Sequence, residues 1–266
     1  MSATQKGTLY EKNSFKVLKK LGLVVGQPAL AISTIPDLQI VRAGGSVNSA
    51  AGLELKMTPT SAGGLVMQYV NGRWIMGDTE GKDEKIFLST LANSEGVLDI
   101  ANDKKSKWGK NIPYLQYNSA GKKIYRGNIT AALAYNKDIK QYSGSNEIHV
   151  QVNTNTVIDY YNKKACHYMN VGTHGLYLLG GADPLGLNAA LHKAKHPPIP
   201  MFNFPVHIRC RCQPKGGGSY NFNMVLTMKS AAKSEYNLLP SSGSGVISLS
   251  MFGKNKNKFL LDAFGV

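Results

Sequence analysis

The chain has 266 residues, of which 42% are hydrophobic and 18% charged, a composition that excludes a disordered chain and allows a sizeable core. Lysine and arginine outnumber aspartate and glutamate by 31 to 16, so the formal net charge of +15 favours a polyanionic partner. Three cysteines cannot build a disulfide framework, and the sequence contains neither an apolar run long enough to span a membrane nor the apolar core of a signal peptide.

The first predicted element is an amphipathic helix over residues 13–22. Phe15, Leu18 and Leu21 form its apolar side, lysines form the opposite side, and Gly22 is suited to end it. Two interpretations stay open at this point. The helix can cover the edge of a sheet, or it can act as a basic arm that rests on nucleic acid.

Most of the remaining chain alternates apolar and polar residues with the period of a β-strand. The segments with this pattern are 52–58, 65–70, 73–76, 147–154, 220–228 and 245–251. Asn71-Gly72 separates two of them and is typical of a type I′ hairpin turn.

Long polar stretches rich in glycine lie between these segments, and many short strands with long loops are typical of sandwiches and jelly rolls. We therefore predict an all-β fold, an antiparallel β-sandwich or jelly roll with long loops and a short N-terminal helix. In this prediction residues 1–22 form a basic arm or helix, and residues 23–266 form a single jelly-roll-like domain.

The segment FPVHIRCRCQ, residues 204–213, has the clearest alternation. Its even positions carry small or apolar side chains, which are Val206, Ile208, Cys210 and Cys212. Three of its odd positions carry basic side chains, which are His207, Arg209 and Arg211. In a strand the two sets point to opposite faces, so one metal ion cannot easily take ligands from both. We interpret the cysteines as core residues and predict a positive stripe on the other face.

No motif in the sequence indicates a catalytic site. The glycines at 216–218 lack the lysine and the strand-to-helix context of a phosphate loop, and we find neither paired carboxylates nor a nucleophile elbow. We therefore predict a protein without enzymatic activity, cofactor or bound metal. A metal-dependent enzyme that uses Cys210 and Cys212 stays open as an alternative.

A second row of cations lies near the end of the sequence. Lys254, Lys256 and Lys258 alternate with asparagines and would lie on one side of an extended segment. Such rows suit the neutralisation of phosphates, which gives salt-sensitive affinity without sequence preference. An ordinary solvated face is the alternative for either row, and the scarcity of acidic residues around both rows favours nucleic acid.

Several motifs follow one another in the last third of the chain. They are the glycine pair and loop GGADPLGL, the tetrapeptide KHPP, the strand that begins FPV, and the terminal run SGVISLSMFGKNKNKFLLD. In this order they resemble the C-terminal part of parvovirus-type capsid proteins. The chain is shorter than members of that family and lacks their phospholipase segment, and residues 1–150 do not match the early strands of the family.

The resemblance implies a jelly roll that assembles into an icosahedral shell around single-stranded DNA. It also implies that His196, Pro197 and Pro198 lie near the packaged nucleic acid. The alternative for these three residues is a rigid extended turn, because proline fixes φ and keeps its predecessor out of the helical region.

Our leading hypothesis from the sequence is a viral coat protein. Many copies would form a homo-oligomeric shell without a membrane span, and a basic inner surface would package the viral genome. The protein would then occur in the virion and, during assembly, in the host cytoplasm or nucleus. The alternative is a viral movement protein or single-stranded nucleic-acid-binding protein that coats nucleic acid without a closed shell.

Overall fold

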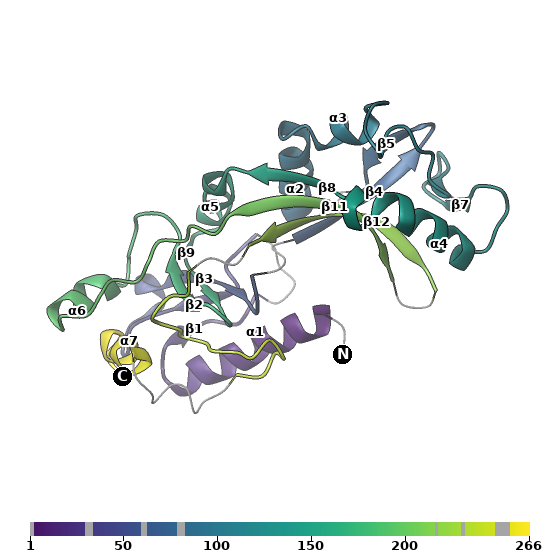
Figure 1. Ribbon diagram of the computed structural model, residues 1–266. Coiled ribbons are helices and arrows are strands. Elements are labelled where there is room, and N and C mark those ends of the chain that lie inside the picture. The colour runs from purple at the N-terminus through teal and green to yellow at the C-terminus, as the bar shows by residue number, and fades with distance from the viewer. Residues whose placement is uncertain are drawn as a thin grey trace. The chain divides into compact units, whose positions relative to one another are not determined.

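The computed structural model describes residues 3–29, 34–59, 63–78, 83–215, 218–229, 232–247 and 256–266 (Figure 1). The chain divides into two compact units. Unit 1 contains residues 1–60, 153–204 and 229–266, and unit 2 contains residues 61–152 and 205–228. Each unit is therefore assembled from segments that are far apart in the sequence, and residues 1–22 belong to unit 1.

Unit 1 is built on a five-stranded mixed sheet with the strand order β1-β2-β3-β9-β10. Its strands are β1 (Val24–Val25), β2 (Leu38–Ile40), β3 (Ala51–Lys56), β9 (Cys166–Val171) and β10 (Gly175–Leu178). Its helices are α1 (Ala3–Lys20), the 3-10 helix η1 (Val47–Ser49), α5 (Thr154–Lys163), α6 (Leu187–Lys193) and α7 (Lys256–Phe264). β3 runs parallel to β9, and the other pairs are antiparallel.

Helix α1 contains the predicted helix but begins at Ala3. Tyr10 and Leu18 on its apolar side are buried in the core of unit 1. The helix ends in a Schellman motif, in which Gly22 has a φ of +68° and the N–H of Leu23 donates to the Leu18 carbonyl at 2.9 Å. The predicted end of the helix is therefore confirmed, and the buried side favours the interpretation that the helix covers a sheet.

Unit 2 is built on a seven-stranded mixed sheet with the order β7-β6-β4-β12-β11-β8, and β5 pairs with β4. Its strands are β4 (Gly63–Val70), β5 (Arg73–Met76), β6 (Leu115–Tyr117), β7 (Lys123–Tyr125), β8 (Ile148–Val152), β11 (Val206–Pro214) and β12 (Tyr220–Met228). Its helices are α2 (Asp83–Ser94), α3 (Val97–Asn102), α4 (Ala131–Tyr142) and the 3-10 helix η2 (Gly144–Asn146). Figure 1 shows β8, β11 and β12 side by side, as their pairing requires.

The predicted hairpin of β4 and β5 is confirmed. Val70 pairs with Arg73, and the two residues between them, Asn71 and Gly72, have φ values of +48° and +81°. Positive φ at both central residues is the requirement of a type I′ turn. Glycine and asparagine reach this region at low cost, so the local sequence was sufficient to place the turn.

Helices cover one face of the unit 2 sheet and enclose an aromatic core there. Tyr142 of α4 and Trp74 of β5 pack on Phe222 of β12, with ring centroids 5.1 and 4.8 Å away. Helix α2 lies on the same face. Its Leu88 is so close to Gly63 of β4 that a Cβ on this glycine would lie 3.1 Å from the leucine side chain. We call the opposite side of the sheet, which carries the odd-numbered side chains of β11, the polar face.

The predicted all-β jelly roll is wrong. The described residues form seven α-helices, about 32% of the chain is helical and 27% is in strands, and both sheets mix parallel and antiparallel pairs. Helices α4 and α5 were missed although both carry capping signals. Thr130 accepts a hydrogen bond from the Leu133 N–H, and Asn153 accepts one from the Asn155 N–H. Among the described residues, no helix has both the length and the apolar character that crossing a bilayer requires.

Strand β3 carries a buried ion cluster on the face to which its polar side chains, Glu54 and Lys56, belong. The Glu54 carboxylate, 4% exposed, accepts hydrogen bonds from Lys56 Nζ at 2.6 Å and Lys164 Nζ at 3.1 Å. Burial opposes the ionisation of Glu54, but the two ammonium groups outweigh it and hold the pKa of this carboxyl below its ordinary value. Both faces of β3 are therefore buried, one by apolar contacts and one by paired charges.

Asp37 lies beside this cluster and accepts a hydrogen bond from the Leu55 N–H at 2.7 Å. Burial, followed by repulsion from Glu54, raises the pKa of Asp37 to about 8. The ammonium of Lys56 and the carboxyl of Glu11 also act on it, in opposite directions. The folded protein therefore keeps a proton that the unfolded chain releases near pH 4, the ordinary pKa of aspartate being about 3.9.

We expect the free energy of unfolding to fall as the pH rises from about 4 through 8, because the folded state binds the extra proton in this window. The loss between about pH 6 and about pH 9 should be about 1–3 kcal/mol. Asp37→Asn keeps an oxygen acceptor for Leu55 and removes the titration, so its stability should depend less on pH. Urea unfolding followed by circular dichroism measures both slopes, and equal slopes would contradict the assignment.

Candidate nucleic-acid interface

The segment 103–111 of unit 2, which we call the lysine loop, presents four exposed ammonium groups. They belong to Lys104, Lys105, Lys107 and Lys110. The loop backbone is held in place by the buried side chain of Trp108, whose Nε1 donates to the Asn146 carbonyl at 2.7 Å. Because the loop is anchored, these charges are positioned before any ligand arrives, and less conformational entropy is lost on binding.

Gly109 allows the tight turn of the lysine loop. A Cβ at this position would lie 2.1 Å from the Asp103 carbonyl oxygen, far closer than atoms can approach. The carboxylate of Asp103 accepts a hydrogen bond from the Lys105 N–H at 2.9 Å, and Asn111 Nδ2 donates to the Lys107 carbonyl at 2.7 Å. Local hydrogen bonds therefore shape the loop, and its lysine side chains remain exposed.

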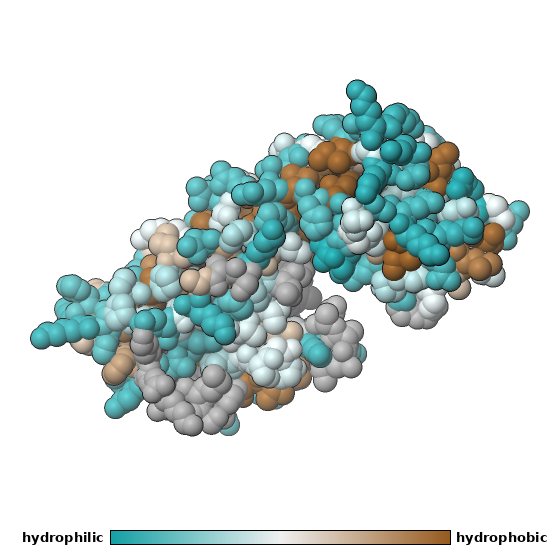
Figure 2. All heavy atoms as spheres, in the orientation of Figure 1, coloured by the Kyte–Doolittle hydropathy of each residue, from teal (hydrophilic) through white to brown (hydrophobic). Residues whose placement is uncertain are grey.

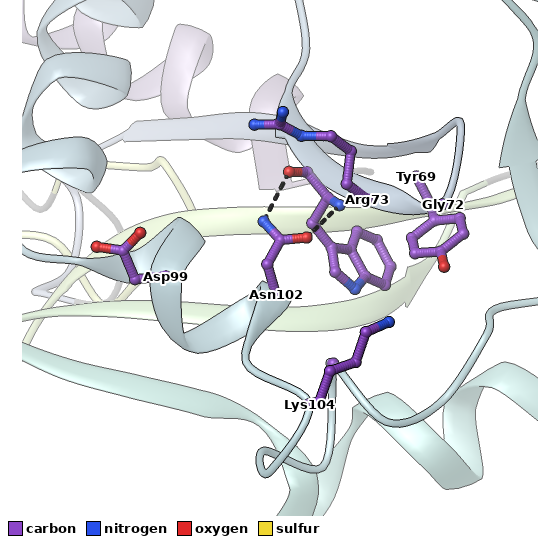
Figure 3. Close-up of a pocket in the computed structure, with 8 residues that line it drawn as sticks. Tyr69, Gly72, Arg73, Asp99, Asn102 and Lys104 are labelled. Atoms are coloured by element: carbon purple, nitrogen blue, oxygen red, sulfur yellow. Dashed lines mark hydrogen bonds between the residues drawn. The ribbon is translucent and has the colours of Figure 1, made fainter.

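A pocket of about 310 Å³ lies where the lysine loop meets the hairpin of β4 and β5 (Figure 3). Arg73 and Lys104 extend from opposite sides of it, and Asp99 contributes one carboxylate. Asn102 fixes the wall by accepting from the Trp74 N–H at 2.7 Å and donating to the Trp74 carbonyl at 3.0 Å. The positive charge of the loop thus continues onto the end of the hairpin.

The predicted two-faced strand is confirmed in β11. Val206, Ile208, Cys210 and Cys212 are all buried, and the residues between them are partly exposed. The three cysteines of the chain are free thiols, and burial raises the pKa of Cys210 and of Cys212 well above the ordinary value. Among the described residues, no group of three His, Cys, Asp or Glu side chains is placed to hold a metal ion.

The polar face of β11 is less free for phosphates than its sequence predicts. Arg209 forms a two-pronged ion pair with Glu147, in which Nε donates to one carboxylate oxygen and Nη2 to the other at 3.0 Å. His149 of the neighbouring strand lies 3.3 Å from the same carboxylate. Burial opposes ionisation of Glu147, but Arg209 outweighs it and holds the pKa of this carboxyl below its ordinary value. The charge of Arg209 is therefore largely neutralised inside the protein.

Arg211 is the cation of this strand that stays available. Within the described part of the chain its Nε is buried without a hydrogen-bond partner, and its charge acts on the Glu147 carboxyl without a direct ion pair. His207 lies on the same face, and its carbonyl accepts from the Thr227 hydroxyl at 3.2 Å.

Three lysines from different elements meet in a second pocket on the polar face, which we call the lysine pocket. Lys85 of α2, Lys123 of β7 and Lys215 after β11 line it. Lys123 is fixed by two hydrogen bonds from its Nζ, to Asn221 Oδ1 at 2.6 Å and to the Tyr220 carbonyl at 2.9 Å. In Figure 2 hydrophilic side chains cover most of the visible face of unit 2, between smaller hydrophobic patches.

The other predicted nucleic-acid contacts lie in unit 1. His196 is partly buried and stacks on Phe259, with ring centroids 3.7 Å apart, while Pro197 and Pro198 are exposed. The structure thus gives His196 a packing role in this unit.

The predicted row of Lys254, Lys256 and Lys258 is corrected in part. Lys256 and Lys258 belong to helix α7 and not to an extended segment, so the strand-like alternation that predicted a row on one side does not apply. Lys258 is exposed, and Lys254 lies outside the described residues, as do 248–251 of the predicted strand 245–251.

Sequence reasoning missed the lysine loop and the lysine pocket. The loop had a readable signal, since four lysines in seven residues surround one tryptophan, yet it lies in one of the long polar stretches to which we assigned no role. The pocket had none, because its lysines at 85, 123 and 215 are separated by long stretches of chain. Only the sheet of unit 2 brings them together.

Comparison of the chain with protein-family models, with curated proteins and with solved structures found no match. The resemblance to parvovirus-type capsid proteins therefore stays a prediction from the sequence.

Proposed function

We propose that this protein binds single-stranded nucleic acid, without sequence preference, through the lysine loop and the polar face of unit 2. The observation that carries the proposal is the lysine loop, an anchored segment with four exposed lysines. Anchored cations suit phosphates because most of the affinity for a polynucleotide comes from neutralising its backbone. The net charge of +15 supports the same partner over the whole chain.

The position of the cations supports a single strand over a duplex. Proteins that read duplex DNA insert a helix or a two-stranded ribbon into the major groove. Here Arg211 and Lys123 lie on the face of a sheet, and Lys107 of the lysine loop lines a pocket together with Ile148 and His149 of the edge strand β8. Open sheet faces and positively charged grooves are the surfaces on which single strands bind.

Assembly into a viral shell is not part of this proposal. The prediction of a shell rested on a resemblance that implied a jelly roll. The two mixed sheets of the structure do not form a jelly roll. Coating of nucleic acid without a shell needs only the basic surface. Electron micrographs of the purified protein would distinguish the two, since closed particles of one diameter indicate a shell and beaded filaments indicate coating.

The test replaces Lys104, Lys105, Lys107 and Lys110 by glutamine. We expect the affinity for a labelled oligothymidylate to fall at least tenfold, because four phosphate contacts are lost. The slope of log Kd against log salt should decrease by about 3, since each phosphate neutralised on a single strand contributes about 0.7. Fluorescence anisotropy from about 50 to about 200 mM salt measures both quantities.

A matched control removes the same charge from unit 1. Lys12, Lys16, Lys19 and Lys20 of α1 are exposed, and their replacement by glutamine should change the affinity less than threefold. An equal loss in both variants would show that net charge, or a basic arm at α1, carries the binding. That result, or the absence of binding by the natural protein, would overturn the proposed interface.

A further inference from the structure

The lysine pocket is a small and strongly charged hollow. A surface that only follows a phosphate backbone does not need such a hollow. Its volume is about 230 Å³, below the range of about 300–1,000 Å³ typical of pockets for drug-sized ligands. Besides Lys85, Lys123 and Lys215, its wall includes the amides of Gln68 and Asn221. A ligand of this pocket is therefore small and carries several hydrogen-bond acceptors.

Lys123 is held toward the pocket by groups that are themselves fixed. Asn221 is only 3% exposed, and its Oδ1 accepts from Lys123 Nζ at 2.6 Å. The Tyr220 carbonyl accepts a second bond from the same nitrogen. An ammonium has three donors, so one remains for a ligand.

Among the described residues that line the pocket, one carboxylate, that of Asp78, stands against the three ammonium groups. Asp78 lies at its rim and is exposed, and its backbone carbonyl accepts from Lys85 Nζ at 3.4 Å. Partial burial, followed by the charge of Lys215, lowers the pKa of Lys123. An anion between Lys123 and Lys215 would offset the repulsion between their two ammonium groups. The attraction of both groups would in turn strengthen the binding of the anion.

The charge decides which phosphate fits. Counted over the described residues that line the pocket, three cations and one carboxylate leave two positive charges unbalanced. A phosphodiester inside a strand carries one negative charge, whereas a phosphomonoester carries about 1.5 to 2 near pH 7. The pocket therefore matches a phosphomonoester better than a linkage within a strand.

We propose that the lysine pocket binds a phosphomonoester, the terminal phosphate of the nucleic-acid strand that the polar face holds. The inference rests on the proposed function for the source of that phosphate. Lys123, Lys215 and Lys85 supply the positive charge for the phosphate, and the amide of Gln68 lines the same pocket. The protein would then prefer strand ends that carry a phosphate.

The experiment compares oligothymidylates of one length with a 5′-phosphate, a 3′-phosphate or no terminal phosphate. We expect the natural protein to bind one phosphorylated form at least tenfold more tightly than the unphosphorylated form. Lys215→Gln, at an exposed position, should reduce this ratio to less than twofold. Lys122→Gln, an exposed neighbour of Lys123, removes the same charge outside the pocket and should keep the ratio.

Equal affinity of the natural protein for all three oligonucleotides would overturn the inference. Loss of the ratio in Lys122→Gln as in Lys215→Gln would overturn it as well, because net charge would then explain the preference. Failure of the proposed interface has a different signature. The lysine-loop variant would then bind every oligonucleotide as the natural protein does, and a titration with adenosine monophosphate would show whether Lys215→Gln still weakens phosphomonoester binding.

Discussion

Replacing Glu54 by alanine should destabilise unit 1 by about 3–5 kcal/mol, the usual cost of leaving a buried charge without its partner. The Glu54 carboxylate is the common acceptor of Lys56 and Lys164, whose side chains are 18% and 10% exposed. Without it, two ammonium groups would face each other in a poorly solvated site.

Both tryptophans of the chain, Trp74 and Trp108, lie in unit 2, so tryptophan fluorescence does not report directly on unit 1. Urea unfolding of Glu54→Ala is therefore followed by circular dichroism.

A compensated variant separates the loss of the charge from the loss of packing. Glu54→Leu combined with Lys56→Met and Lys164→Met removes all three charges and keeps their volume. Because apolar residues of similar size replace buried ion networks at little cost, most of the stability should return. A loss below about 1 kcal/mol in Glu54→Ala would show that water reaches the two lysines and that the cluster is not sealed.

Asp138→Ala should destabilise unit 2 by about 3–5 kcal/mol, because each unsatisfied buried donor costs about 1–3 kcal/mol. Asp138 is fully buried on α4 and accepts three hydrogen bonds. They come from the N–H of Tyr114 at 2.8 Å, the N–H of Leu115 at 2.9 Å and the hydroxyl of Tyr220 at 2.6 Å. One carboxyl thus ties the helix to β6 and β12.

The control for Asp138 is Tyr220→Phe, which removes one of the three hydrogen bonds and keeps the ring. It should cost about 1 kcal/mol, well below the alanine variant. Tryptophan fluorescence suits both measurements, since Trp74 and Trp108 lie in the aromatic core that α4 covers. Equal losses in the two variants would mean that the backbone donors of β6 find other acceptors when Asp138 is removed.

Glu54 and Asp138 also explain why the sequence does not reveal which polar residues are buried and hold the fold together. Glu54 occupies the polar position of an alternating strand, a pattern that normally indicates a solvated face. Lys164, which makes burial of Glu54 tolerable, lies 110 residues further along the chain. No local sequence pattern indicates that the polar face of such a strand will also be buried.

Features set by a few neighbouring residues were determined by the sequence alone. The period-two pattern of 206–212 was sufficient for a two-faced strand, because successive side chains of a strand point to opposite sides. Asn71-Gly72 was sufficient for its turn, and Gly22 for the end of its helix, because both need positive φ.

Only the tertiary structure decided how the basic side chains are arranged. It paired Arg209 with Glu147, 62 residues earlier, and so removed it from the stripe that the strand pattern predicted. It anchored the lysine loop through Trp108 and Asn146, and it collected Lys85, Lys123 and Lys215 around one pocket. The physical reason is that spacing along a strand or turn follows from backbone geometry, whereas contacts between distant segments depend on which faces are buried together.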